Sequence, residues 1–155
     1  MTGAAGTNVH ATAVVIESRC LLFIGPSGSG KSSVALACLM AARDHGLFAA
    51  LVADDQVFVS TVNGRIIARR PSSIAGLAEL RGAGIVPVAS LQSAVLDYAI
   101  LPVSPPFKER VPPETERHVL PDGNALPLLR LPLMAGLRPF DTLRLLLAKT
   151  AVISQ

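Results

Sequence analysis

The stretch that decides the fold of this chain reads Gly25-Pro26-Ser27-Gly28-Ser29-Gly30-Lys31-Ser32. It has the G-x-x-x-x-G-K-[ST] spacing of a phosphate-binding loop. An apolar run, residues 21–24, comes just before it, and a helix-forming stretch, residues 33–42, follows. This strand–loop–helix order is the setting that such a loop requires.

The residue types in this loop suit phosphate chemistry. Glycines let the backbone wrap so that several N–H groups point inward, and the start of the next helix adds its positive dipole end. Lys31 is expected to reach the terminal phosphates, and the Ser32 hydroxyl to hold Mg²⁺. The alternative interpretation is a Gly/Ser turn that binds nothing.

The composition favours one compact domain, residues 1–155, with an aliphatic core. Half of the 155 residues are hydrophobic and only 4% are aromatic. The net charge of +3 suits a nucleotide better than a long nucleic acid, although it also serves solubility alone. The arginines at 65, 69 and 70 lack interleaved aromatic residues, which argues against nucleic-acid stacking.

Cysteine usage and the N-terminus indicate a cytoplasmic protein. Cys20 and Cys38 form neither a C-x-x-C pair nor a metal spacing, so we expect reduced, partly buried thiols. Residues 1–7 carry no secretory signal, and no apolar run is long enough to span a membrane.

The pattern along the chain predicts an α/β fold with a mixed sheet. Asn63-Gly64 between β-branched runs is a strong hairpin signal. A proline-dense segment, residues 102–113, predicts a loop. Helices are predicted at 33–43 and 141–153, and β structure is predicted at 9–16, 20–24, 47–53, 56–62, 65–69, 85–88, 95–101 and 126–133.

Asp54 and Asp55 follow a predicted strand and are expected to lie beside the loop. A helix from 32 to 44 carries the chain roughly 20 Å away at 1.5 Å per residue. The strand 47–53 returns it about the same distance. One carboxylate can then orient Mg²⁺ while the other takes a proton from an attacking hydroxyl. The alternative is an Asp-Asp turn without function.

Three further positions are weaker candidates. If residues 79–85 are extended, Glu79 and Arg81 point the same way, which suits a metal ligand and a phosphate clamp; a glycine turn with a surface ion pair is the alternative. His10 is either a partly buried side chain or a contact to phosphate. Arg110, in the proline-rich loop, is either solvated or a mobile cation that closes on phosphate.

Taken together, these motifs resemble the HPr kinase/phosphorylase family, from about His10 to the end of the chain. The family pattern is a strand His, then G-x-x-x-x-G-K-S, V-A-D-D and E-[IL]-R-G-x-G-I. The corresponding stretches are His10 and residues 25–32, 52–55 and 79–85, in the same order and at matching separations.

The resemblance implies a role for most candidates. His10, Lys31, Asp55 and Arg110 fall on catalytic positions, and Arg81 joins them in stabilising charge on the transferred group. Ser32 and Glu79 fall on Mg²⁺ ligands, with Asp54 beside them. It also implies the fold shared with phosphoenolpyruvate carboxykinase, a hexamer, and a catalytic domain without the regulatory domain of long members, similar to the short form of some proteobacteria.

Two departures from the family pattern bear on the reaction. Ser33 stands where the family usually has Glu. The basic P-V-R-P-G-R segment, linked in the family to phosphate-dependent dephosphorylation, has its nearest match at residues 132–137, where both arginines are missing. Arg138 is the nearest substitute. The resemblance therefore predicts the kinase direction over the phosphorylase direction.

The resulting expectation is a protein-serine kinase that uses ATP and Mg²⁺ to phosphorylate the phosphocarrier protein HPr and so regulates carbon metabolism. No nucleic-acid or membrane partner is expected. Two alternatives remain open: a kinase for a small metabolite, and a nucleotide-sensing module without transfer activity.

Overall fold

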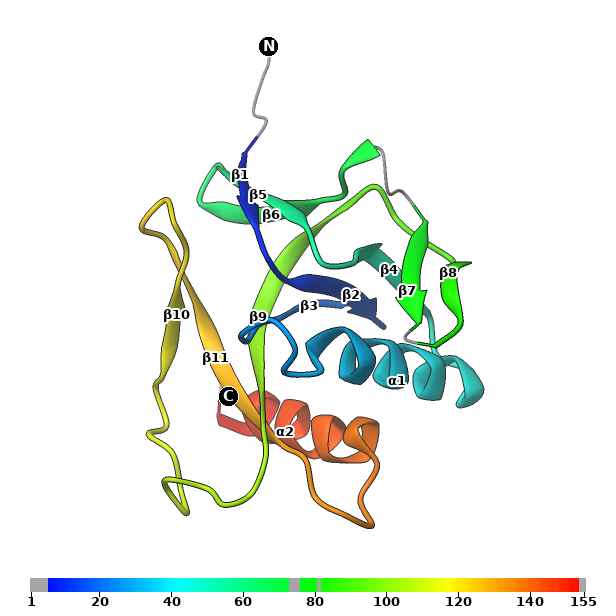
Figure 1. The fold of residues 1–155 in the computed structure, drawn as a ribbon. Helices are drawn as coiled ribbons and strands as arrows, with labels where there is room; N and C mark the ends of the chain where they lie inside the picture. The colour runs from blue at the N-terminus through cyan, green and yellow to red at the C-terminus, as the bar shows by residue number, and fades with distance from the viewer. Residues whose placement is uncertain (1–5, 73–75, 81, 154–155) are drawn as a thin grey trace.

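The computed structural model of the chain describes residues 6–72, 76–80 and 82–153. Within them, a nine-stranded mixed sheet carries both helices on one side (Figure 1). The main path of the sheet runs β1-β5-β6-β9-β3-β2-β4, with β11 also paired to β9 and β10 paired to β11. The elements have the following bounds: β1 Thr7–Val9, β2 Thr12–Ile16, β3 Arg19–Phe23, α1 Lys31–Asp44, β4 Ala49–Ala53, β5 Val57–Val62, β6 Arg65–Arg69, β7 Leu77–Leu80, β8 Gly84–Pro87, β9 Ser93–Val103, β10 Arg117–Val119, β11 Ala125–Pro132 and α2 Pro139–Ile153.

Both faces of the central strands are buried, which explains their continuous apolar sequences. On β3, Leu21 and Phe23 face the helices, whereas Cys20 and Leu22 face the opposite side. The first side is completed by α1 and α2, which pack against each other (Figure 1). The second side is covered because the sheet curls, so that β5 and β6 lie over β2 and β3.

The predicted α/β class with a mixed sheet is confirmed. The Asn63-Gly64 hairpin forms as expected, with φ of 53° and 78° at its two turn residues, and β11 forms although it contains Pro127. Its pairing with the central strand β9 begins at Leu128, one residue beyond that proline.

The structure refines three sequence expectations. The stretch 9–16 has the predicted β structure but is divided between two strands, because β1 pairs with β5 while β2 pairs with β3 and β4, and the chain bends between them at His10. Residues 79–85 are not extended throughout, since β7 and β8 form an antiparallel hairpin. The proline-rich loop begins only after Val103, where β9 ends.

Cys20 and Cys38 are free thiols in the core, as expected. Burial raises the pKa of each to about 12, which keeps both thiols protonated and unreactive at neutral pH. Across the described ranges, no helix is both long and apolar enough to cross a membrane.

Candidate functional site

The glycine-rich segment forms an open loop between β3 and α1. Its glycines at 25, 28 and 30 have φ of 142°, 82° and 88°, a region that other residues enter only with strain. The Ile24 N–H donates to the Ile100 carbonyl at 2.9 Å, which fixes the start of the loop to β9. The loop thus has the backbone conformation that aims successive N–H groups into one concavity.

The N-terminus of α1 is left open to an anion. Gly30 occupies the capping position without a side-chain hydrogen bond, and the first turn contains no acidic residue. The first intrahelical bond is donated by Val34 to Gly30, so the N–H groups of residues 31–33 have no partner within the helix. Unpaired N–H groups and the positive end of the helix dipole attract phosphate.

Lys31 is the buried cation of this site. Only 4% of it is exposed, yet no carboxylate among the described residues forms an ion pair with it. Lys31 lines the cleft, so it offers an incoming anion a positive charge that no carboxylate of the described residues neutralises.

A β-bulge turns Asp54 toward α1. Along β2 and β4, Val14 pairs with Leu51 but Ala13 pairs with Ala53, so that Val52 is one extra residue on β4. Without it, Ala53 would stand opposite Thr12, and Asp54 would point to the other face of the sheet. The extra residue places Asp54 opposite Thr12, on the helix side.

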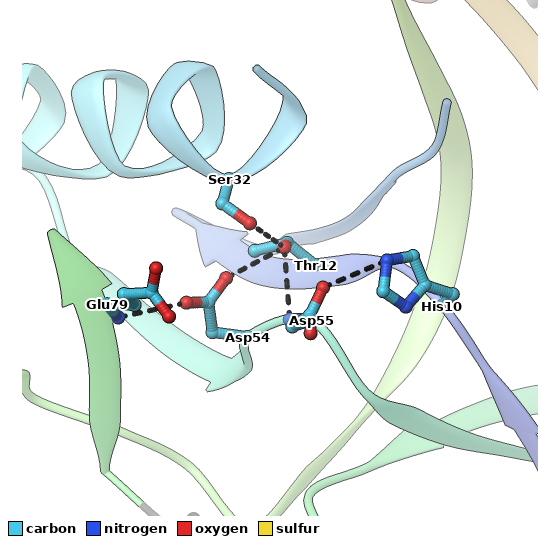
Figure 2. A network of polar contacts seen from close by, with 6 residues as sticks. All are labelled: His10, Thr12, Ser32, Asp54, Asp55 and Glu79. Atoms are coloured by element: carbon cyan, nitrogen blue, oxygen red, sulfur yellow. Dashed lines mark hydrogen bonds and ion pairs between the residues drawn. The ribbon is translucent and has the colours of Figure 1, made fainter. Parts of the chain in front are cut away.

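Thr12 lies at the centre of the network of polar contacts shown in Figure 2. Its buried hydroxyl donates to Asp54 Oδ1 at 2.9 Å, lies 3.0 Å from Ser32 Oγ, and accepts from the Asp55 N–H at 3.3 Å. Asp54 Oδ2 accepts from the Glu79 N–H at 3.2 Å. One residue of β2 therefore connects the start of α1 with the end of β4, and Asp54 extends the connection to β7.

Asp55 and His10 form the solvent-facing part of the site. The two atoms His10 Nε2 and Asp55 Oδ1 are 3.1 Å apart, and about half of each side chain is exposed (Figure 2). Asp55 has a φ of 69°, which turns its carboxylate away from the direction that Asp54 takes. A contact this exposed adds little stability, but it fixes the direction in which the Asp55 carboxylate points.

These groups line one cleft of about 250 Å³. That volume is below the range for a drug-sized ligand, so the cleft suits the phosphate end of a nucleotide. Its lining comprises His10, Ser27, Gly28, Gly30, Lys31, Ser32, Ser33, Asp54, Asp55 and Glu79. The structure thus brings together His10, both aspartates, Glu79 and most of the glycine-rich loop.

Of the predicted residues that the structure describes, Arg110 is not part of this site. Arg110 lies in the segment between β9 and β10 and does not line the cleft. The neighbouring Glu109 lies 3.9 Å from Arg130 of β11. This contact connects the segment to β11 and not to the cleft. Arg81 lies outside the described residues.

The candidate metal ligands are all oxygen groups. Ser32, Asp54 and Glu79 line the cleft together. Within residues 6–72, 76–80 and 82–153, no three His, Cys, Asp or Glu side chains are arranged as a metal site. Nucleotide-bound Mg²⁺ typically takes only one or two protein carboxylates, the rest being phosphate oxygens and water.

Thr12 and the bulge are the functional features that the sequence did not reveal. The available signal was a polar residue in phase with Val14 and Ile16, on the face of β2 that packs against α1. A polar residue at a core position of a strand needs a buried partner.

The fold and the cleft define an α/β domain with a glycine-rich loop joining a strand to a helix. The model of the HPr Serine kinase C-terminal domain family matches residues 2–96, which include the loop, both aspartates and Glu79, and the chain belongs to this family. The family to which the sequence motifs pointed is thereby confirmed.

Curated relatives agree with this family. The chain is 37% identical over 99 residues to the HPr kinase/phosphorylase of Clostridium tetani, covering 63% of this chain and 30% of that protein. For Clostridium beijerinckii the identity is 36% over 85 residues, 55% of this chain and 26% of that protein. The chain thus matches less than a third of the length of these relatives.

The Hpr(Ser) kinase/phosphatase from Coxiella burnetii has a similar fold, with a TM-score of 0.75 and 23% identity over 96% of this chain and 94% of that chain. The likeness therefore extends through β11 and α2, beyond the part of the chain matched by the family model.

Proposed function

We propose that this chain is an ATP- and Mg²⁺-dependent protein-serine kinase whose acceptor is HPr. The observation that carries the proposal is Lys31, a cation that lines the cleft at an uncapped helix N-terminus and has no carboxylate partner among the described residues. Membership of the HPr Serine kinase C-terminal domain family supports the reaction and the acceptor.

The residues around the cleft fit a magnesium nucleotide. The N–H groups of the loop and of the first turn of α1 donate to phosphate oxygens, and Lys31 neutralises the terminal phosphates. Ser32 and Glu79, with Asp54 behind them, offer the oxygen atoms that Mg²⁺ prefers. The metal, when bound, neutralises charge that develops on the phosphates during transfer.

Asp55 is the proposed general base. In the tautomer with the proton on Nε2, His10 donates to Asp55 Oδ1 and leaves Oδ2 free for an incoming hydroxyl. Asp55 accepts the serine proton as the serine oxygen bonds to the γ-phosphorus. The bond from that phosphorus to the bridging oxygen breaks, and ADP leaves.

The remaining parts of the proposal come from the sequence pattern and the family resemblance. They are charge stabilisation by Arg81 and Arg110, a hexameric assembly, a cytoplasmic location and regulation of carbon metabolism. Because Arg110 lies outside the cleft of its own chain, its role requires the segment between β9 and β10 to move or a second copy to supply it. The mass of the assembly in solution tests the oligomer.

The deciding experiment is an intact-mass assay on purified HPr with ATP and Mg²⁺. A single phosphoryl addition, absent with an HPr whose acceptor serine is alanine, supports the proposal. ATP binding without any transfer would favour a nucleotide-sensing module, and transfer to a metabolite pool alone would favour a metabolite kinase. Adding excess inorganic phosphate to the phosphorylated HPr tests the reverse direction.

A further inference from the structure

The hydroxyl of Thr12 makes three polar contacts, and together they determine the direction of the hydrogen bonds in the site. Thr12 is fully buried, and its Oγ1 contacts Asp54 Oδ1, Ser32 Oγ and the Asp55 backbone nitrogen. A threonine hydroxyl has one proton and two lone pairs, so all three are used.

The donor in each contact follows from the chemistry of the partners. The carboxylate of Asp54 can only accept, and the N–H of Asp55 can only donate. The single Thr12 proton therefore goes to Asp54, at 2.9 Å. In the remaining contact, at 3.0 Å, Thr12 has no proton left, and the Ser32 hydroxyl must donate.

The direction of the hydrogen bond from Ser32 to Thr12 determines which part of the Ser32 hydroxyl faces the cleft. Its only proton is directed at Thr12, behind the site, so the oxygen presents lone pairs alone to a ligand. Lone pairs suit a cation and repel a phosphate oxygen. Ser32 is thus set as a metal ligand before any ligand arrives.

We propose that Thr12 is a positioning residue that orients Ser32 and Asp54 for Mg²⁺; this rests on the proposed magnesium-nucleotide site. The residue does not itself contact the ligand, because it lies behind both partners and does not line the cleft. Residues that orient metal ligands typically change metal affinity 10–100-fold when they are removed.

The test measures ATP affinity by calorimetry on the whole chain, with Mg²⁺ titrated and with a chelator present. In Thr12→Val, we expect the Mg²⁺ concentration for half-maximal enhancement of ATP binding to rise roughly 10–100-fold. ATP affinity in the chelator should stay within about twofold, because Lys31 and the loop are untouched. Thr12→Ser keeps the hydroxyl and should retain the parental Mg²⁺ dependence.

Two controls separate positioning from general damage. Thr61→Val removes a hydroxyl from the far hairpin, where Thr61 bonds Asp122, and should leave the Mg²⁺ dependence unchanged. Ser32→Ala should also weaken Mg²⁺, and the double variant should lose less than the sum of the two single losses, because Thr12 acts in part through Ser32.

Each outcome is decisive. A parental Mg²⁺ dependence in Thr12→Val, or fully additive effects with Ser32→Ala, overturns the role of Thr12 and leaves the proposed function standing. A parent chain without any Mg²⁺-dependent ATP binding overturns both. If Thr12→Val does not fold, Thr12→Cys serves in its place, since the thiol keeps the bulk but is a weak donor.

Discussion

Thr12 and Asp54 stand opposite each other on neighbouring strands only because β4 contains one residue more than the register of β2 requires. Bulges often re-aim a side chain beside a functional site. Here the extra residue, Val52, is buried on the far side of the sheet, so the shift exposes no apolar surface. The position of the acidic pair beside the glycine-rich loop therefore depends on the local pairing of two strands.

Asp55→Asn should separate binding from chemistry. An amide cannot accept the serine proton, so we expect transfer to HPr to fall by about 10²–10⁴-fold, while ATP affinity stays within about twofold. Single-turnover transfer and calorimetric titration with ATP measure the two quantities. Asp44→Asn, at the exposed far end of α1, makes the same chemical change outside the cleft. Parental transfer rates in Asp55→Asn would remove it from this role.

Lys31→Met should leave the stability of the ligand-free chain nearly unchanged and strongly reduce its response to ATP. Methionine keeps most of the apolar length of the buried side chain and removes its charge, so the free energy of unfolding in urea should stay within about 1 kcal/mol of the parent. ATP at 100 times the parental Kd should add about 2.7 kcal/mol to the parent but only about 0.4 kcal/mol to a variant that binds a hundredfold more weakly. A loss of stability without ligand would show that Lys31 already has a favourable partner.

Gly30→Ala should affect both stability and binding, whereas Gly64→Ala should affect stability alone. The two glycines have φ of 88° and 78°, and an added Cβ would meet nothing within 4 Å at either position. Both variants should lose about 1–2 kcal/mol through backbone strain. Only Gly30→Ala distorts the N-terminus of α1, so only this variant should bind ATP more weakly. Equal ATP affinities in the two variants would show that the loop conformation does not govern binding.

Asp141→Asn should make the chain less sensitive to acid. Hydrogen bonds from the Arg138 guanidinium, at 3.0 and 3.1 Å, hold the pKa of the Asp141 carboxyl below its ordinary 3.8. A carboxyl whose pKa is lower in the folded state contributes stability above the unfolded pKa, and this contribution disappears as the pH falls through the folded value. Urea midpoints of parent and variant should therefore differ at pH 7 and converge well below pH 3.8. A difference that persists in acid would contradict this origin.

Local chemistry explains what could be predicted from the sequence. The glycine-rich loop and the Asn63-Gly64 turn need positive φ, which few residues accept, so their sequences identify them directly. The placement of Asp54 and Asp55 beside the loop followed from the lengths of one helix and one strand.

Features that depend on distant partners could not be predicted in this way. The bend at His10 arises because β1 and β2 pair with different strands. The bulge at Val52 depends on the register between β2 and β4. Hydrophobic periodicity cannot reveal this register, because both faces of the two strands are buried. The contact between Thr12 and Asp54 depends on that register, so it could not be predicted from the sequence either.

The strand β9 lies at the centre of the sheet and pairs with β3, β6 and β11, and its Ile100 carbonyl accepts the first hydrogen bond of the glycine-rich loop. Amides in such a strand exchange with solvent only when most of the domain opens. The start of the loop is consequently fixed to a strand paired on both sides, so we expect partial unfolding at the sheet edges to leave its geometry intact.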